Sequence, residues 1–122
     1  MSLVVDACVE MPCPNGVGAC KKGELLAGEF FTGNLISVKD GKRTVLGTGF
    51  RGADAIERDA EGNIYLSNWV QGKVWKLDPN GKNEVVIKDG FQSAADFYLD
   101  LEAKQIVLPD MLAGTINFIP LK

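Results

Sequence analysis

Three oxygen-bearing side chains recur at one repeat position of this 122-residue chain. Asn15, Asp54 and Asp96 each lead into a short apolar stretch, at a spacing of about 40 residues. Amide and carboxylate oxygens with no nitrogen or sulfur donor beside them suit a hard cation such as Ca²⁺ or Mg²⁺. Because Asn and Asp also cap turns, the spacing alone leaves a metal site and a structural turn equally open.

A second polar set follows the same repeat and comprises Glu29, Asn68 and Asp110. These residues end the next apolar stretch and could rim the same opening and contact a substrate, although we favour solvated loops for them. A large apolar residue follows each of the three. We expect these apolar side chains to pack in the core between repeats and not to form a binding stripe. They are Phe30, Trp69 and Met111.

The elements that must position these residues belong to a repeat of about 40 residues. Gly23 to Val38, Gly62 to Leu77 and Lys104 to Ile116 align with one another and are rich in β-branched residues, with glycine between them. Such a repeat is typical of propeller blades, each of which must bury its faces against a neighbour. The sequence therefore predicts an all-β chain of about three four-stranded antiparallel blades, half of a six-bladed ring.

Alternating apolar residues and turn signals predict the strands of each repeat. We expect 17–21, 24–30, 34–39 and 43–47 in the first repeat, then 53–59, 63–69, 73–77 and 83–88 in the second. The last repeat offers 96–100, 105–109 and 115–120, without a fourth strand. The blades then cover roughly 14–50, 51–91 and 92–122 of a single partial propeller unit, 1–122.

The segment Leu3 to Asp6, within 3–7, reads as a fourth strand that has no blade of its own. Open blade edges are prone to pair with other chains. We therefore expect either a second copy of the chain, as a homodimer, or a missing N-terminal half to complete the ring.

The composition of the chain argues against some classes of binding partner. A net charge of −3 and a pI near 4.9 argue against nucleic acid, and no apolar run approaches the ~18 residues of a membrane span. The sequence as given fits a cytoplasmic protein, and a periplasmic one if a signal peptide has been removed.

The spacing of Cys8, Cys13 and Cys20 matches no zinc site. These cysteines either pack as small apolar residues or form a disulfide, and the sequence leaves both alternatives open.

Several segments carry a resemblance to a known family. They are Pro14-Asn15-Gly16, Gly52 to Glu57, Asp59 to Trp69, Ala94 to Asp96 and Leu108 to Leu112. Together they resemble the C-terminal half of the gluconolactonase and regucalcin family, over nearly the whole chain. NHL-repeat and strictosidine-synthase-like propellers share the coarser pattern.

The resemblance implies a six-bladed propeller with one divalent cation on its axis, Ca²⁺ or another such as Mg²⁺ or Zn²⁺. Asn15 and Asp54 match two of the family's metal ligands, and Asp54 also matches its proposed general base. The family's glutamate ligand has no counterpart here, and alanine flanks Asp54 where the family prefers glycine. The implied function is hydrolysis of a small lactone or ester, such as a sugar-derived lactone. The alternative is a non-catalytic NHL-like module that binds a ligand or a protein partner.

Overall fold

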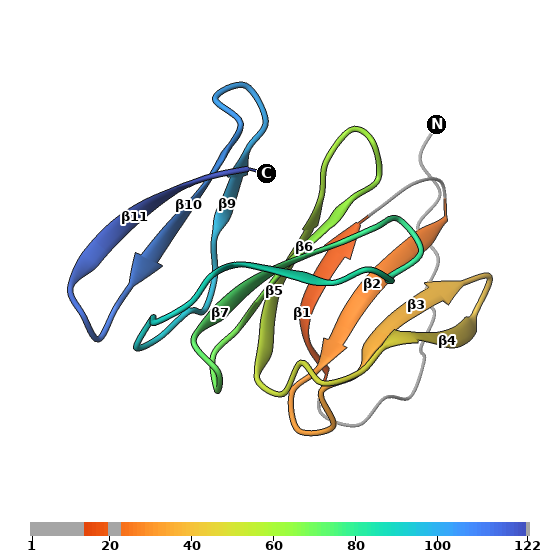
Figure 1. The fold of residues 1–122 in the computed structure, drawn as a ribbon. Helices are drawn as coiled ribbons and strands as arrows, with labels where there is room; N and C mark the ends of the chain where they lie inside the picture. Colours follow the sequence, from red (N-terminus) through yellow and green to blue (C-terminus); the bar gives the residue numbers. More distant parts are fainter. Residues whose placement is uncertain (1–13, 20–22, 122) are drawn as a thin grey trace, which may run out of the picture.

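A computed structural model describes residues 14–19 and 23–121 of the chain (Figure 1). These residues form eleven strands in antiparallel sheets and include no helix, so none of them forms a helix long and apolar enough to cross a bilayer. The prediction of an all-β fold is confirmed. The three cysteines and the predicted strand from Leu3 to Asp6 lie outside the described residues, as does Lys122.

The first blade is a four-stranded antiparallel sheet in chain order. Its strands are β1 (Pro14–Ala19), β2 (Glu24–Glu29), β3 (Leu35–Lys39) and β4 (Lys42–Gly47). The last four residues of β2 are all buried, and among them Leu26 packs in a core shared with the second blade.

The second blade repeats this order with β5 (Ala53–Arg58), β6 (Ile64–Asn68), β7 (Lys73–Leu77) and β8 (Val85–Lys88). Every residue of β6 is buried. Since this blade lies between the other two (Figure 1), both faces of its sheet are covered. A strand covered on both faces shows no alternation of buried and exposed residues.

The third blade consists of β9 (Tyr98–Asp100), β10 (Gln105–Asp110) and β11 (Thr115–Pro120), with β10 in the middle. No described residue forms a fourth strand beside β11. Most of β11 is exposed, and along β10 buried residues alternate with more open ones. This period of two is what a sheet covered on one face produces.

Two separate hydrophobic cores join neighbouring blades. The core between the first and second blades contains Leu26, Leu35, Phe50, Ala53, Ile56, Ile64, Leu66 and Leu77. The core between the second and third blades contains Ala55, Tyr65, Val74, Ile87, Ala94, Phe97, Ile106, Leu108 and Ile119. Each blade is thus held by burial against its neighbour, which stabilises the fold by roughly 1.5–3 kcal/mol for each large side chain that is fully buried.

Turns of the same kind gather at the same edge of the molecule. The β2–β3, β6–β7 and β10–β11 turns all lie along the lower edge in Figure 1, together with the β4–β5 and β8–β9 loops. The β5–β6 and β9–β10 turns lie at the opposite edge. We call the lower edge the doublet face and define it by residues 30–33, 69–72 and 111–114, since each turn begins with two adjacent apolar residues.

Candidate functional site

A buried polar residue, which we call an anchor, precedes each of the three turns of the doublet face. Glu29, Asn68 and Asp110 end β2, β6 and β10, and their exposed fractions are only 1%, 0% and 3%. The expectation that they belong to solvated loops is therefore wrong. The repeat correctly aligned these positions, but polarity alone gave no sign of their burial, which follows from the hydrogen bonds that each one makes inside the protein.

Glu29 holds the β2–β3 turn through both carboxylate oxygens. Its Oε1 accepts hydrogen bonds from Thr32 Oγ1 at 2.7 Å and Asn34 Nδ2 at 3.0 Å. Its Oε2 pairs with Arg43 Nη2 at 2.9 Å. The buried charge is thus compensated by a cation and by two donors, which a buried carboxylate requires.

Asp110 holds the β10–β11 turn and the β8–β9 loop at once. Its carboxylate accepts the backbone N–H groups of Gln92, Ser93 and Ala113 at 2.8–3.1 Å, and the Ser93 hydroxyl at 2.8 Å. Burial works to raise the pKa of Asp110, but these donors outweigh burial and hold the pKa below its usual value of 3.8.

Asn68 carries no charge, and its side chain bonds to the β4–β5 loop and to β7, not to the turn that follows β6. Its Nδ2 donates to the Arg51 carbonyl at 3.2 Å, and its Oδ1 accepts the Trp75 Nε1 hydrogen at 2.9 Å. The polar atoms of all three anchors therefore hold turns and loops in place. Direct contact of Glu29, Asn68 or Asp110 with a substrate stays a prediction.

Each anchor is followed by two adjacent apolar residues, and all of these except Phe30 are exposed. Trp69 is 46% exposed and Met111 82% exposed, so the expectation that they pack in the core between blades is wrong. Phe30 is half-buried, with its ring centroid 6.3 Å from that of Trp69. The second member of every doublet is exposed as well. These second members are Phe31, Val70 and Leu112.

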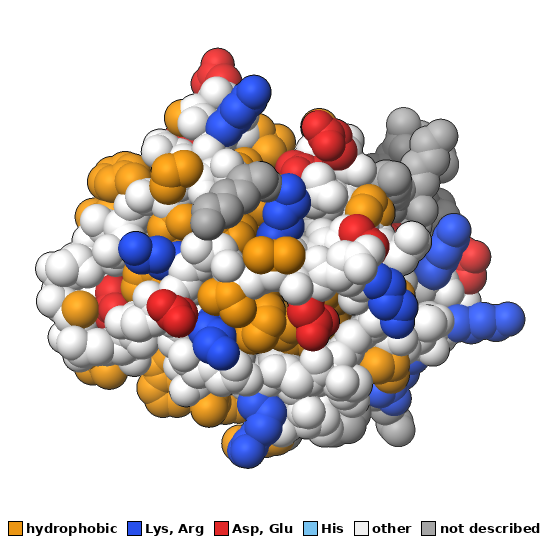
Figure 2. Space-filling model, in the orientation of Figure 1, with side chains coloured by type: hydrophobic (Ala, Val, Ile, Leu, Met, Phe, Trp, Pro, Cys, Tyr) orange, Lys and Arg blue, Asp and Glu red, His pale blue; other side chains and the backbone are white. Residues whose placement is uncertain are grey.

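Hydrophobic side chains also show along the lower rim of the space-filling view, which sees the doublet face from the side (Figure 2). The sequence did contain a signal for this surface, because an apolar pair recurs in all three repeats immediately before a small or polar residue and a glycine. Adjacent side chains in an extended segment point to opposite sides, so two successive apolar residues in a turn cannot both face the same core.

A pocket of about 430 Å³ opens among the doublets. Its walls include Phe30, Trp69, Pro109 and Met111, and its acidic groups are Asp54 and Asp96. A pocket of this size, mostly apolar with a few polar groups, has the usual character of a ligand site.

Local backbone structure places the two acids in this pocket. The register of β5 against β6 shifts between Ala53 and Ile56, an irregularity of the β-bulge kind that redirects the side chains near it. The buried Ser67 hydroxyl accepts the N–H of Ala55 at 3.1 Å and donates to the carbonyl of Ala95. One serine therefore ties the residue after Asp54 to the residue before Asp96.

The acids of the pocket influence one another electrostatically. Partial burial, and then the nearby Asp96 carboxylate, raise the pKa of Asp54 above 3.8. The same two causes raise the pKa of Glu57 above its usual value of 4.5. Among the described residues the ion pairs are Arg43 with Glu29 and Arg58 with Glu24, so no described lysine or arginine neutralises the acids of the pocket.

The predicted metal ligands are only partly brought together. Asp54 and Asp96 line one pocket, whereas Asn15 lies in β1 and its side chain is not among those described. Two carboxylates have the donor type that a hard cation prefers, but in the described part of the chain no three His, Cys, Asp or Glu residues group as metal ligands. Metal binding by Asn15, Asp54 and Asp96 stays a prediction, as does catalysis by Asp54.

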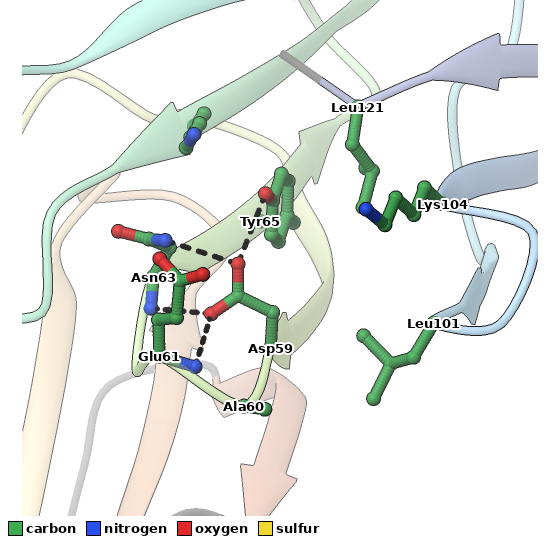
Figure 3. Close-up of a pocket in the computed structure, with 9 residues that line it drawn as sticks. Asp59, Ala60, Glu61, Asn63, Tyr65, Leu101, Lys104 and Leu121 are labelled. Carbon is green, nitrogen blue, oxygen red and sulfur yellow. Dashed lines mark hydrogen bonds between the residues drawn. The ribbon is translucent and has the colours of Figure 1, made fainter.

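A second pocket of about 430 Å³ lies at the opposite edge, between the β5–β6 and β9–β10 turns (Figure 3). Asp59 is one of its lining residues. The Asp59 carboxylate accepts four hydrogen bonds of 2.9–3.2 Å, from the backbone N–H of Glu61, from the backbone and side-chain nitrogens of Asn63 and from the Tyr65 hydroxyl. These donors outweigh burial and lower the pKa of Asp59. Burial, and then the Asp59 charge, raise the pKa of Tyr65 to about 12. Asp59 thus stabilises the β5–β6 turn through these hydrogen bonds.

Solved structures resemble this arrangement of blades. A chain in the crystal structure of a nidogen/laminin complex superimposes with a TM-score of 0.73 at 20% identity, over 80% of this chain and 40% of that chain. Streptogramin B lyase superimposes with a TM-score of 0.65 at 16% identity, over 93% of this chain and 43% of the lyase chain.

The chain thus spans less than half the length of either structure, both of which are β-propellers. No protein-family model matches the sequence, and no curated protein does. At these identities the likeness concerns the fold alone and does not single out the gluconolactonase branch. Together with the sheet topology, it shows that this chain has the β-propeller fold.

Proposed function

We propose that the chain is a binding module whose doublet face docks a protein partner. The observation that carries this proposal is the exposure of an apolar doublet in every blade, at one edge of the molecule. Water-exposed clusters of large apolar side chains are uncommon in monomers and mark interaction surfaces. Trp69 supplies the side chain that most often contributes strongly to protein interfaces.

The buried anchors support the same function. Glu29, Asn68 and Asp110 fix the start of each turn, so the doublets are held in place before any partner arrives. A surface ordered in advance loses less conformational entropy on binding, which favours affinity. The nidogen/laminin structure also contains a propeller within a protein complex, which supports a protein partner as the first candidate.

The test compares two exposed leucines in turns at opposite edges. Leu112 on the doublet face is 62% exposed, and Leu101 in the β9–β10 turn is 50% exposed. A random dodecapeptide phage library is selected against the unmodified chain, and the selected pool is then bound to Leu112→Ser and Leu101→Ser. We expect Leu112→Ser to lower retention about tenfold, equal to about 1.4 kcal/mol, and Leu101→Ser to leave retention unchanged. Equal retention by both variants would reject the proposal.

A second candidate is a metal-dependent lactone hydrolase, favoured by the half-buried Asp54 beside Asp96 in one pocket. A carboxylate whose pKa is raised is a stronger base. Asn15, Asp54 and Asp96 would supply the oxygen ligands of a Ca²⁺ ion, and the ion would polarise the lactone carbonyl. The test is hydrolysis of a sugar lactone with added Ca²⁺. Turnover that Asp54→Asn abolishes would support the hydrolase, and a rate equal to the buffer rate would reject it.

A further inference from the structure

We propose that the partner segment inserts a lysine or arginine side chain, flanked by apolar residues, into the pocket formed by Trp69, Met111, Asp54 and Asp96. This inference rests on the proposed function, since it names the chemistry that the doublet face recognises. Three features of the pocket carry it, which are its charge, its walls and the apolar surface around it.

The negative charge of the pocket favours a positively charged ligand. Asp54 and Asp96 lie in its lining and Glu57 lies near Asp96. No described residue gives the carboxylates of Asp54 and Glu57 a hydrogen bond or an ion pair, and the Asp96 carboxylate accepts only the adjacent Phe97 N–H at 3.0 Å. Carboxylates that repel one another in a partly enclosed site gain more from a bound cation than a single exposed carboxylate does.

The walls suit a long basic side chain better than a bare ion. Phe30 and Trp69 present aromatic rings, and Pro109 and Met111 add further apolar surface. Lysine and arginine carry three or four methylene groups that pack on apolar surface while the charged head reaches a carboxylate. Aromatic faces also attract such a head, and tryptophan attracts it most strongly.

The surroundings favour a protein segment over a small amine. Phe31 and Val70 are exposed beside the pocket but do not line it. A small organic cation confined to the pocket leaves these two side chains in water. A segment with apolar residues on either side of its basic residue covers them.

The experiment uses four equimolar mixtures of random heptapeptides whose central residue is fixed as arginine, lysine, citrulline or glutamate. Citrulline matches arginine in shape but carries no charge. The mixtures are passed over the immobilised chain and the retained peptide is quantified by mass spectrometry. We expect retention of the arginine and lysine mixtures about tenfold above the citrulline mixture, with the glutamate mixture retained least.

Matched variants assign the charge preference to the pocket. Asp54→Asn and Asp96→Asn should each bring the arginine-to-citrulline ratio close to one. Asp40→Asn changes the net charge equally at the exposed β3–β4 turn, where Asn accepts the positive φ of 52°, and should leave the ratio unchanged. Thermal melting confirms that each variant is folded. A ratio that survives both pocket variants overturns the inference.

Other outcomes separate this inference from the proposed function. If retention needs Leu112 but does not distinguish arginine from citrulline, the inference fails and the proposed function stands. If Leu112→Ser and Leu101→Ser retain the mixtures equally, both fail. If free agmatine displaces the arginine peptides at equal concentration, the flanking apolar contacts contribute nothing, and the site is one for a small cation.

Discussion

Glu29, Asn68 and Asp110 occupy one position in three repeats but satisfy their buried polar atoms in three different ways. Glu29 uses a cation, Asp110 uses backbone N–H groups and a hydroxyl, and Asn68 uses an indole N–H together with a carbonyl. The shared requirement is a side chain whose buried polar atoms find partners in nearby turns, loops or strands. The residue type can vary between repeats as long as its neighbours vary with it.

Asp110→Asn tests the role of the charge in an anchor. An amide keeps only one acceptor oxygen, so an NH2 group in place of Oδ2 would face the N–H of Gln92, and we expect a lower urea midpoint at neutral pH. Because the folded-state pKa of Asp110 lies below 3.8, its stabilisation is complete above the unfolded-state pKa and is lost as pH falls through the folded-state pKa. The deficit of the variant should therefore shrink as pH falls below about 4. Asp40→Asn is the control, and an unchanged midpoint for Asp110→Asn would contradict the assigned role.

Asp54→Asn should have the opposite effect on stability. The folded-state pKa of Asp54 is raised, so wild-type stability declines as pH rises from the unfolded-state pKa to the folded-state pKa, and stays at the lower level above it. At pH 7 the variant should be more stable by at most about 0.5 kcal/mol, since solvent screens a half-exposed group. At about pH 3 residue 54 is largely neutral in the wild type as well as in the variant. Urea unfolding at that pH should therefore show no difference in stability between the two. Clear destabilisation at pH 7 would mean that Asp54 is a structural turn residue.

The sequence located the important positions better than it predicted their surroundings. The repeat aligned Asp54 with Asp96, and Glu29 with Asn68 and Asp110, and the structure places these residues at turns and in a shared pocket. The alignment did not predict that the polar anchors are buried, and the exposure of Trp69 was signalled only by the apolar pair that recurs in the three turns. A repeat shows which residues are equivalent, but whether a turn points into a neighbouring blade or into water depends on contacts between blades.

At the scale of elements, glycines link the β2–β3 and β6–β7 turns of the doublet face to the next loop. Gly33 accepts the N–H of Phe50 at 2.9 Å through its carbonyl, and Gly72 accepts that of Phe91 at 3.2 Å. The loop that leads to the following blade thus lies directly against the turn. A methyl group on Gly72 would lie 2.2 Å from the Phe91 carbonyl oxygen, so only glycine fits there without displacement of the loop.

Gly72→Ala and Gly114→Ala form a matched pair. Both glycines have positive φ, +63° and +71°, but a methyl group on Gly114 meets nothing within 4 Å. We expect Gly114→Ala to cost about 1 kcal/mol from the backbone conformation alone. Gly72→Ala should cost about 3 kcal/mol or more, because the clash adds to this strain. The measurement is chemical denaturation of both variants, and equal costs would show that the loop does not press on the turn.

The strands themselves were largely predictable, because turn residues and period-two alternation are local properties. Each expected strand from 17–21 to 115–120 has a counterpart in the structure. The β9 strand is shorter than expected and begins at Tyr98 instead of Asp96. Asp96 bonds through its carboxylate to the N–H of Phe97, and such local bonds compete with strand pairing.

At the scale of the whole molecule, the two outer blades expose apolar side chains. Val17 and Leu25 are exposed on the first blade, and Tyr98, Ile116 and Phe118 are exposed on the third. A shallow pocket of about 380 Å³ between Tyr98 and Ile116 adds to the open face of the third blade. The inner blade shows how such faces are covered, since both of its faces pack against a neighbour.

A second copy of the chain can cover these faces, so we expect a homodimer in which two sets of three blades form one ring. The measurement is light scattering at micromolar concentration. Phe118→Glu should shift the population to monomer, because a charge in an apolar interface is costly, whereas Leu101→Glu at the β9–β10 turn should not. A wild-type chain that remains monomeric would reject this expectation. The sequence predicted the blades and a completed ring; the blades are confirmed, and completion of the ring stays a prediction.

The separation of the two hydrophobic cores has a consequence for native-state fluctuations. The cores share no residue, so the third blade can detach while the packing between the first two blades stays intact. Arrays with such nearest-neighbour coupling open in cooperative units and not all at once. Amide hydrogens of β10 should therefore exchange with deuterium through a low-energy opening that leaves those of β2 protected. A chain whose blades loosen one at a time can let a partner enter between blades without unfolding as a whole.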